Sequence, residues 1–342
     1  MLNKAGKRLS MALRLLVKGQ QAPPLRADIP PISPDEVAEA KGFFSREKFF
    51  IFGHARSGTT LLARLIRLHP EVHCNYQAHF FTRPPLLQSL VADAEVKKWL
   101  TRRSNRWNRG RDLSPVVLRA VSDFILEREA QQVGKPIVGD KSPSSLLDGE
   151  AVHLMRKVYP DARLIYIVRD GRDTAISRRF QSFVDSPHRL SKEDLRIRAE
   201  FARRPAPFMH GERSIFTEKG IRQAAEGWVK NVLETNQAGQ ELYGSRYASL
   251  RYEDLLECPW DEMSRLWSFL DAATTDPGLE GALMAELQEN PDADWQHQKA
   301  NEIAQSLQKG QHGSWREMFT PRDHQIFQEI AAETLKQWGY DA

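Results

Sequence analysis

Residues 48–60 read Lys-Phe-Phe-Ile-Phe-Gly-His-Ala-Arg-Ser-Gly-Thr-Thr, and this segment is the most informative about the fold. Its apolar run predicts a buried strand that ends at Gly53. Gly53 and Gly58 bracket four residues, and Thr59 and Thr60 follow, which is the frame of a phosphate-binding loop with threonine in the lysine position. The apolar residues that come next share one face of a helix. Strand, loop and helix N-terminus together direct backbone N–H groups at an anion.

The loop contains one cation, Arg56. In a nucleoside triphosphatase, the lysine of this motif holds the β- and γ-phosphates. Because Arg56 stands three residues before the lysine position, the loop suits a phosphate but not a triphosphate. The alternative interpretation is an ordinary strand–turn–helix, in which the glycines only form the turn.

A second anion motif follows another apolar run, Leu164 to Val168. The run predicts a buried strand that ends at Arg169, and Asp173 or Thr174 is expected to open a helix that carries Ser177. In open parallel sheets, ligands bind at the carboxyl ends of the strands. A guanidinium and a hydroxyl there suit a phosphate monoester. Taken alone, the segment is more simply explained as a surface turn.

A third segment, residues 309–320, begins with Lys309 and Gly310 and has a second glycine three residues later. Glycines beside a lysine predict a flexible cationic loop that brings backbone close to a ligand. A linker before the last helix is the alternative. Thr320 is expected to cap that helix and Gly339 to end it.

Together the three segments resemble the sulfotransferases that use 3′-phosphoadenosine 5′-phosphosulfate (PAPS). The resemblance implies a 5′-phosphosulfate loop, a separate 3′-phosphate site, a late segment that closes over that phosphate, and a tyrosine near the adenine. The residues that it assigns to these parts are Arg56, Ser57, Gly58, Thr59, Thr60, Arg169, Ser177, Lys309, Gly310 and Tyr252. It implies an α/β, three-layer fold of the P-loop NTPase type, with a central, mainly parallel sheet flanked by helices.

The resemblance also implies a reaction, the transfer of the sulfuryl group from PAPS to an acceptor hydroxyl. Charge should grow on the leaving phosphate oxygen in a loose, in-line transition state, and we expect Arg56 and Lys141 to stabilise it. Lys141 follows a short predicted strand, and Ser142-Pro143 is expected to start the next helix. The alternative for Lys141 is a salt bridge with Asp140.

The proton acceptor departs from the family pattern. The position of the usual glutamate aligns with Gln77, which cannot act as a base, and His79 is two residues further on. If residues 76–81 are extended, Gln77 and His79 lie on the same face, and His79 is then the candidate base. Two alternatives remain: a structural histidine, or an acceptor acidic enough to need no strong base.

No metal is expected, because the loop lacks a neighbouring acidic motif for magnesium and Pro70 separates His69 from His73 on any helical face. Two other function classes stay open. One is a P-loop nucleotide or metabolite kinase, and the other is a catalytically silent PAPS-binding protein.

The charge is uneven along the 342 residues. Residues 1–20 carry five cations and no acid, so the net charge of +4 leaves −1 for the remainder, and a nucleic-acid partner is not expected. We divide the chain into a basic tail with a proline-rich linker, residues 1–45, and a sulfotransferase domain, residues 46–342. Residues 1–20 are either a disordered tail or a peripheral membrane contact. With two cysteines, we expect a cytoplasmic protein, either free or membrane-associated.

The acceptor is the least constrained prediction. Residues 183–215 combine arginines and prolines and are predicted to be irregular, forming either a lid over the acceptor or a solvated charged face. A carbohydrate hydroxyl is the first expectation from the resemblance. A lipid, another small alcohol and a protein tyrosine remain alternatives, and the oligomeric state is not predicted.

Overall fold

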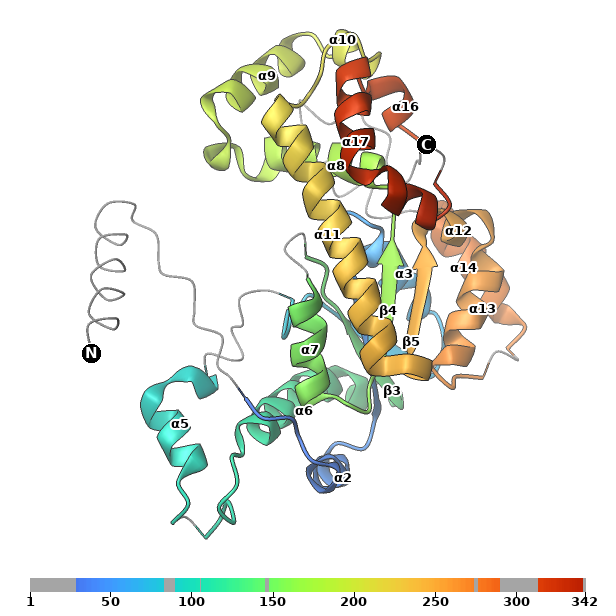
Figure 1. Cartoon of the computed structure of the whole chain (residues 1–342). Coiled ribbons are helices and arrows are strands. Elements are labelled where there is room, and N and C mark those ends of the chain that lie inside the picture. Colours follow the sequence, from blue (N-terminus) through green and yellow to red (C-terminus); the bar gives the residue numbers. More distant parts are fainter. Residues whose placement is uncertain are drawn as a thin grey trace, which may run out of the picture.

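The computed structural model describes residues 29–82, 90–104, 106–144, 148–273, 276–289 and 313–340. The expectations for Lys309, Gly310 and residues 1–20 therefore lie outside the described residues. Figure 1 shows helices on both faces of a central sheet.

The sheet has five strands, all paired in parallel in the order β2-β3-β1-β4-β5. Their bounds are β1 Glu47–Gly53, β2 Val72–Tyr76, β3 Ile137–Lys141, β4 Arg163–Val168 and β5 Tyr247–Arg251. The central strand β1 reads as a continuous apolar run because a parallel strand covered on both faces is apolar on both. The predicted α/β fold with a parallel sheet is confirmed.

Side chains of β1 alternate between two cores, which makes the molecule three-layered. Phe50 and Phe52 face one core and Phe49 and Ile51 face the other. The first core is covered by α6 (Ser114–Gln132), α7 (Gly149–Val158), α11 (Glu218–Tyr243) and α17 (Pro321–Gln337). The second is covered by α3 (Thr59–Ile66), α12 (Tyr252–Glu257), α13 (Pro259–Phe269) and α14 (Gly278–Glu289).

Packed structure begins within residues 1–45, which were predicted to be a tail and a linker. Ile29 and Ile32 are buried, and the amide of Ile32 donates to the carbonyl of Lys157 at 2.8 Å. Helix α2 (Pro34–Phe43) follows, with a capping box between Ser33 and Glu36. Five of residues 20–36 are prolines, but Ile29 and Ile32 are buried and anchor this part of the chain to the domain.

The expectation of an irregular segment at residues 183–215 was wrong for most of its length. Helix α8 (Gly171–Asp185) is followed by η1 (Pro187–Arg189), α9 (Lys192–Arg203) and α10 (Ala206–Met209). The prolines stand at the starts of these elements, where a missing N–H costs nothing. Phe201 and Phe208 are buried and turn the segment into a packed extension, which lies at the top of Figure 1.

Two predicted helix starts were also wrong. Helix α8 begins at Gly171, not at Asp173 or Thr174, because Asp170 accepts a hydrogen bond from the Arg172 amide and caps it. Ser142-Pro143 does not open a helix, and α7 begins at Gly149. The predicted cap of α17, Thr320 with Asp323, is confirmed.

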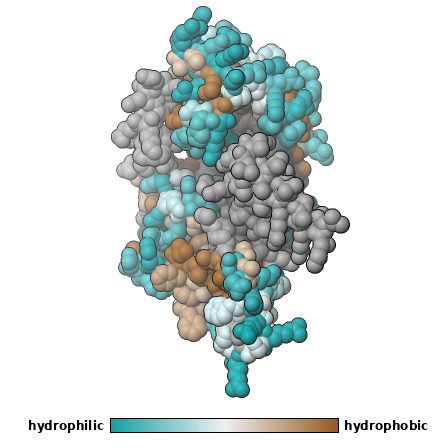
Figure 2. All heavy atoms as spheres, turned by 90° about the vertical axis from the view of Figure 1, so that its left-hand side faces the viewer, coloured by the Kyte–Doolittle hydropathy of each residue, from teal (hydrophilic) through white to brown (hydrophobic). Residues whose placement is uncertain are grey.

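One face carries exposed aromatic side chains around α5 (Ala94–Thr101). The rings of Trp99 and Trp107 lie 4.6 Å apart, and both are about half exposed. Figure 2 views this side and shows hydrophobic residues gathered on its lower part, between hydrophilic ones. No helix in the described ranges is long and apolar enough to cross a membrane.

We predict that any side chain at Gly171 destabilises the fold. A Cβ there would lie 2.5 Å from the ring of Trp228, so Gly171→Ala should lower the free energy of unfolding by about 1–3 kcal/mol. Urea unfolding measures the change. The matched control is Gly227→Ala in α11, where a Cβ meets nothing within 4 Å and should be neutral or stabilising by up to about 1 kcal/mol. Equal urea midpoints for Gly171→Ala and the wild type would contradict the account.

Candidate functional site

The site is built on the loop that joins β1 to α3. Gly58 has a φ of +82°, and a Cβ there would lie 2.1 Å from the ring of Tyr252, so both the backbone and the close approach require glycine. Arg56 also has a positive φ, +81°. Helix α3 has no side-chain cap on its first amides. These amides at the carboxyl end of a parallel strand are suited to an anion.

The second predicted anion motif lies against this loop. Arg56 donates from Nε to the hydroxyl of Ser177 at 3.0 Å, and Arg169 donates from Nη1 to the carbonyl of Arg56 at 3.2 Å. The guanidinium of Arg169 also lies 4.8 Å from the ring centroid of Tyr252. The structure therefore brings Arg56, Arg169, Ser177 and Tyr252 together, although more than a hundred residues separate Arg56 from the others.

Two further features fix the backbone at Arg169. It is the first residue after β4, and its carbonyl accepts a hydrogen bond from Nε1 of Trp228 at 3.1 Å. The same indole covers Gly171 at the start of α8. The sequence did not indicate that Trp228 orients the Arg169 backbone.

Lys141 is the last residue of β3, and its side chain reaches the end of the loop at Thr60. Its Nζ donates to the hydroxyl of Thr60 at 3.1 Å and lies 5.0 Å from the ring centroid of Tyr76. The side chain is almost fully buried. Asp140 forms its hydrogen bonds elsewhere, with the amide of Ala78 and the hydroxyl of Ser142. Lys141 thus lies at the first turn of α3, and its catalytic role stays a prediction.

The expectation that residues 76–81 are extended was wrong. Strand β2 ends at Tyr76, and Gln77 and His79 have φ of +60° and +52°. Gln77 is exposed whereas His79 is buried, so the two side chains do not share a face. Nδ1 of His79 lies 3.0 Å from the hydroxyl of Thr82. The role of His79 as a base stays a prediction.

The turn at residues 77–79 is held by the end of β3. The amides of Gln77, Ala78 and His79 donate in turn to the carbonyl of Lys141 (2.8 Å), the carboxylate of Asp140 (3.0 Å) and the hydroxyl of Ser142 (2.8 Å). These three bonds stabilise a backbone that non-glycine residues rarely adopt. Burial raises the pKa of Asp140 to about 6.

The described part of the late segment docks at the start of α8. Asp173 accepts hydrogen bonds from the amides of Gly313 (2.6 Å) and Trp315 (3.1 Å). The guanidinium of Arg172 lies 3.6 Å from the ring centroid of Trp315, which opens α16 (Trp315–Met318). Lys309 and Gly310 lie outside the described residues. Asp173 was missed because a carboxylate in the first turn of a helix is ordinary.

A buried histidine lies directly under the loop. His54 follows Gly53, its Nδ1 lies 2.9 Å from the carbonyl of Ala55, and its Nε2 lies 3.5 Å from Nη1 of Arg178. Burial, reinforced by the Arg178 charge, lowers the pKa of His54 to about 4. The imidazole is therefore neutral at pH 7, with Nδ1–H donating to Ala55 and Nε2 accepting from Arg178.

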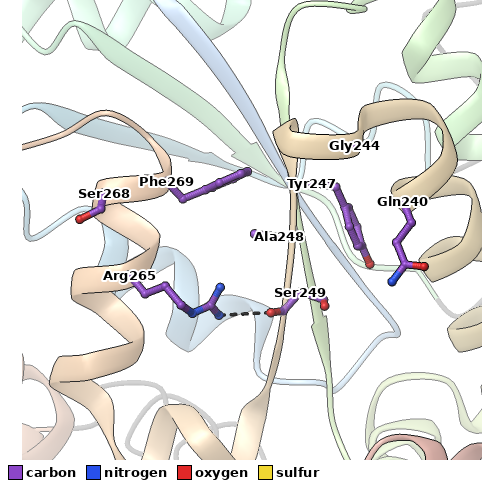
Figure 3. A pocket seen from close by; sticks show the side chains of 8 residues that line it. All are labelled: Gln240, Gly244, Tyr247, Ala248, Ser249, Arg265, Ser268 and Phe269. Atoms are coloured by element: carbon purple, nitrogen blue, oxygen red, sulfur yellow. Dashed lines mark hydrogen bonds between the residues drawn. The ribbon is translucent and has the colours of Figure 1, made fainter.

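A separate hollow of about 820 Å³ lies on the outer edge of β5, toward the amino end of that strand. Figure 3 shows it between the end of α11, with Gln240 and Gly244, and α13, where Arg265 donates to the carbonyl of Ser249 at 3.1 Å. None of its eight lining residues belongs to the loop site. The described ranges contain no cluster of three or more His, Cys, Asp or Glu that could hold a metal ion.

Comparisons with known proteins bear on the family of this chain. The model of the Sulfotransferase family matches residues 48–276. Protein-tyrosine sulfotransferase A of Caenorhabditis elegans is 32% identical over 137 residues, which are 39% of this chain and 34% of the relative. The Drosophila melanogaster protein-tyrosine sulfotransferase is 25% identical over 232 residues, 67% of this chain and 39% of the relative. The chain thus spans between a third and two fifths of these relatives' lengths.

Solved structures are similar at lower identity. Mouse sulfotransferase SULT7A1 complexed with PAP is 18% identical with a TM-score of 0.47, covering 89% of this chain and 90% of that one. The sulfotransferase domain from the Synechococcus PCC 7002 olefin synthase is 16% identical with a TM-score of 0.48, covering 94% and 100%.

His54 predicts a specific acid sensitivity. Its pKa is about 4 in the folded chain against 6.5 unfolded, so the unfolded chain binds the proton first as pH falls. The stability contributed by neutral His54 is complete above pH 6.5 and is lost toward pH 4, a change of about 3 kcal/mol. His54→Asn should remove this loss, measured by urea unfolding from pH 7 to pH 4. Parallel pH curves for the two proteins would refute the assignment.

Proposed function

The chain belongs to the Sulfotransferase family, and on that premise we propose that it transfers the sulfuryl group of PAPS to an acceptor hydroxyl. One observation carries the proposal: Arg169 bonds the Arg56 carbonyl while Arg56 bonds Ser177, so the two predicted anion-binding motifs are in direct contact. PAPS carries a 5′-phosphosulfate and a separate 3′-phosphate, and two neighbouring cationic positions suit that molecule.

The proposed division of labour follows the geometry. The loop from Arg56 to Thr60 binds the 5′-phosphosulfate, because the first amides of α3, which no side chain caps, and the Arg56 guanidinium meet there. Arg169 and Ser177 bind the 3′-phosphate, and Tyr252 lies against both the loop and Arg169, where the adenine is expected. Lys309 and Gly310 are proposed to complete the 3′-phosphate site from the late segment.

In the proposed reaction, the protein mainly positions the two substrates and stabilises the charge that develops on the leaving group. The acceptor oxygen forms a bond to sulfur while the bond from sulfur to the 5′-phosphate oxygen breaks, and the electron pair stays with that phosphate oxygen. Arg56 in the loop and Lys141 beside the first turn of α3 stabilise the growing negative charge. The acceptor proton passes to His79 in our proposal. The turn that carries His79 is tied to Lys141 and Ser142 by backbone hydrogen bonds.

Two classes of acceptor hydroxyl are proposed. The family resemblance favours a carbohydrate hydroxyl. The similar protein-tyrosine sulfotransferases add the phenolic hydroxyl of a peptide tyrosine.

A screen with ³⁵S-labelled PAPS tests the proposal. Sugars, phenols and tyrosine peptides are offered without metal, and label should appear in at least one acceptor within a single turnover. PAPS binding without any transfer would instead support the silent binding protein. Transfer of phosphate from Mg·ATP, with no use of PAPS, would support the kinase.

Arg169→Ala is predicted to separate the two anion sites. It removes a charge-assisted contact to the 3′-phosphate, so it should weaken 3′,5′-bisphosphoadenosine (PAP) by about ten- to a hundredfold. Adenosine 5′-phosphosulfate lacks that phosphate and should be weakened much less. Calorimetry measures both affinities. Equal weakening of the two nucleotides would count against the 3′-phosphate assignment.

His79→Ala is predicted to affect turnover and not nucleotide binding. If His79 is the base, kcat should fall by about 10²–10⁴ while PAP affinity stays nearly unchanged. The rate of the wild type should decline at acid pH as His79 takes up a proton, and the variant should lose this acidic limb. Should both kcat and the limb persist, His79 is a packing residue beside Thr82.

A further inference from the structure

Arg178, one residue after Ser177 on α8, is a half-buried cation that faces no carboxylate of the described residues. Within the described part of the chain, no Asp or Glu lies at salt-bridge distance from its guanidinium. Burial lowers the pKa of Arg178, and no acidic neighbour opposes that shift. The other two arginines of α8 differ: Arg172 pairs with Asp170 at 2.8 Å and Arg179 with Asp194 at 2.6 Å.

The group that Arg178 does contact is neutral. Nη1 of Arg178 lies 3.5 Å from Nε2 of His54, whose Nδ1 is engaged by the carbonyl of Ala55. An imidazole in this state accepts a hydrogen bond but does not balance a positive charge. Removing a guanidinium from water without an opposite charge is costly. The arrangement is explained if an anion binds there during function.

The position of this charge indicates what the anion belongs to. His54 opens the loop after Gly53, and Ser177 beside Arg178 receives the Nε–H of Arg56. Arg178 therefore lies beside the start of the loop to which the 5′-phosphosulfate is assigned. The anionic groups of PAPS already have proposed partners in the loop and in the Arg169–Ser177 pair. Of the two substrates, the acceptor is then the one that could supply a negative charge to Arg178.

We propose that Arg178, oriented by His54, binds a negatively charged group of the acceptor, so that the enzyme prefers anionic hydroxyl compounds. The inference rests on the proposed function and deepens it, because it names the acceptor class. The recognised chemistry is a carboxylate, sulfate or phosphate near the hydroxyl that receives the sulfuryl group. A guanidinium holds such groups through paired N–H donors.

Matched acceptor pairs test the preference with labelled PAPS. The pairs are 4-hydroxybenzoate with 4-hydroxybenzamide, and glucuronate with glucose. The wild type should show a kcat/KM about ten- to a hundredfold higher for the anionic member of a pair that it uses. Arg178→Met should abolish that ratio and Arg178→Lys should retain part of it. Arg213→Met is the control, because Arg213 is an exposed cation paired with Glu200.

A binding measurement decides the question even if none of these acceptors is used. Enzyme saturated with PAP is titrated with benzoate and with inorganic sulfate by calorimetry. Binding that Arg178→Met loses and Arg213→Met keeps, at unchanged PAP affinity, supports the subsite. No anion binding by the wild type, or equal binding by Arg178→Met, overturns it. Failure of PAP itself to bind the wild type would overturn the proposed function instead.

Discussion

The hydrogen bond from Arg169 to the carbonyl of Arg56 is the contact on which the site depends. It joins the loop after β1 to the end of β4, two strands that are neighbours in the sheet. Because all five strands are parallel, their carboxyl ends meet at one edge, and both anion motifs are delivered there. The Arg56–Ser177 bond then closes the link to α8.

Close packing behind the site limits how its residues can move. The ring of Tyr252 fills the space where a Gly58 side chain would lie, and the indole of Trp228 does the same at Gly171. The first contact shapes the loop, and the second supports the Arg169 carbonyl. On the far side, β3 contributes Lys141 and also holds the turn at residues 77–79. A few aromatic contacts thus help to position the cations, which lie at or just after the carboxyl ends of three strands.

Local pattern predicted much of this from the sequence. The apolar run before Gly53, the run before Arg169 and the Thr320 cap are set by neighbouring residues, and all three are found in the structure. The turn at Gln77 and His79 was not predictable, because its positive φ angles are imposed by partners on β3, some sixty residues away. The contact between Arg178 and His54 was likewise not predictable, because it depends on how α8 packs across the loop.

The central claim is that this edge of the sheet holds two separate anions of one nucleotide without a metal. Calorimetric titration in the presence of EDTA tests it most directly, comparing PAP with adenosine 5′-phosphate. The account predicts that PAP binds at least about ten times more tightly, because the 3′-phosphate gains a charge-assisted contact that the other nucleotide lacks. Equal affinities for the two nucleotides, or binding of PAP only when magnesium is added, would contradict it.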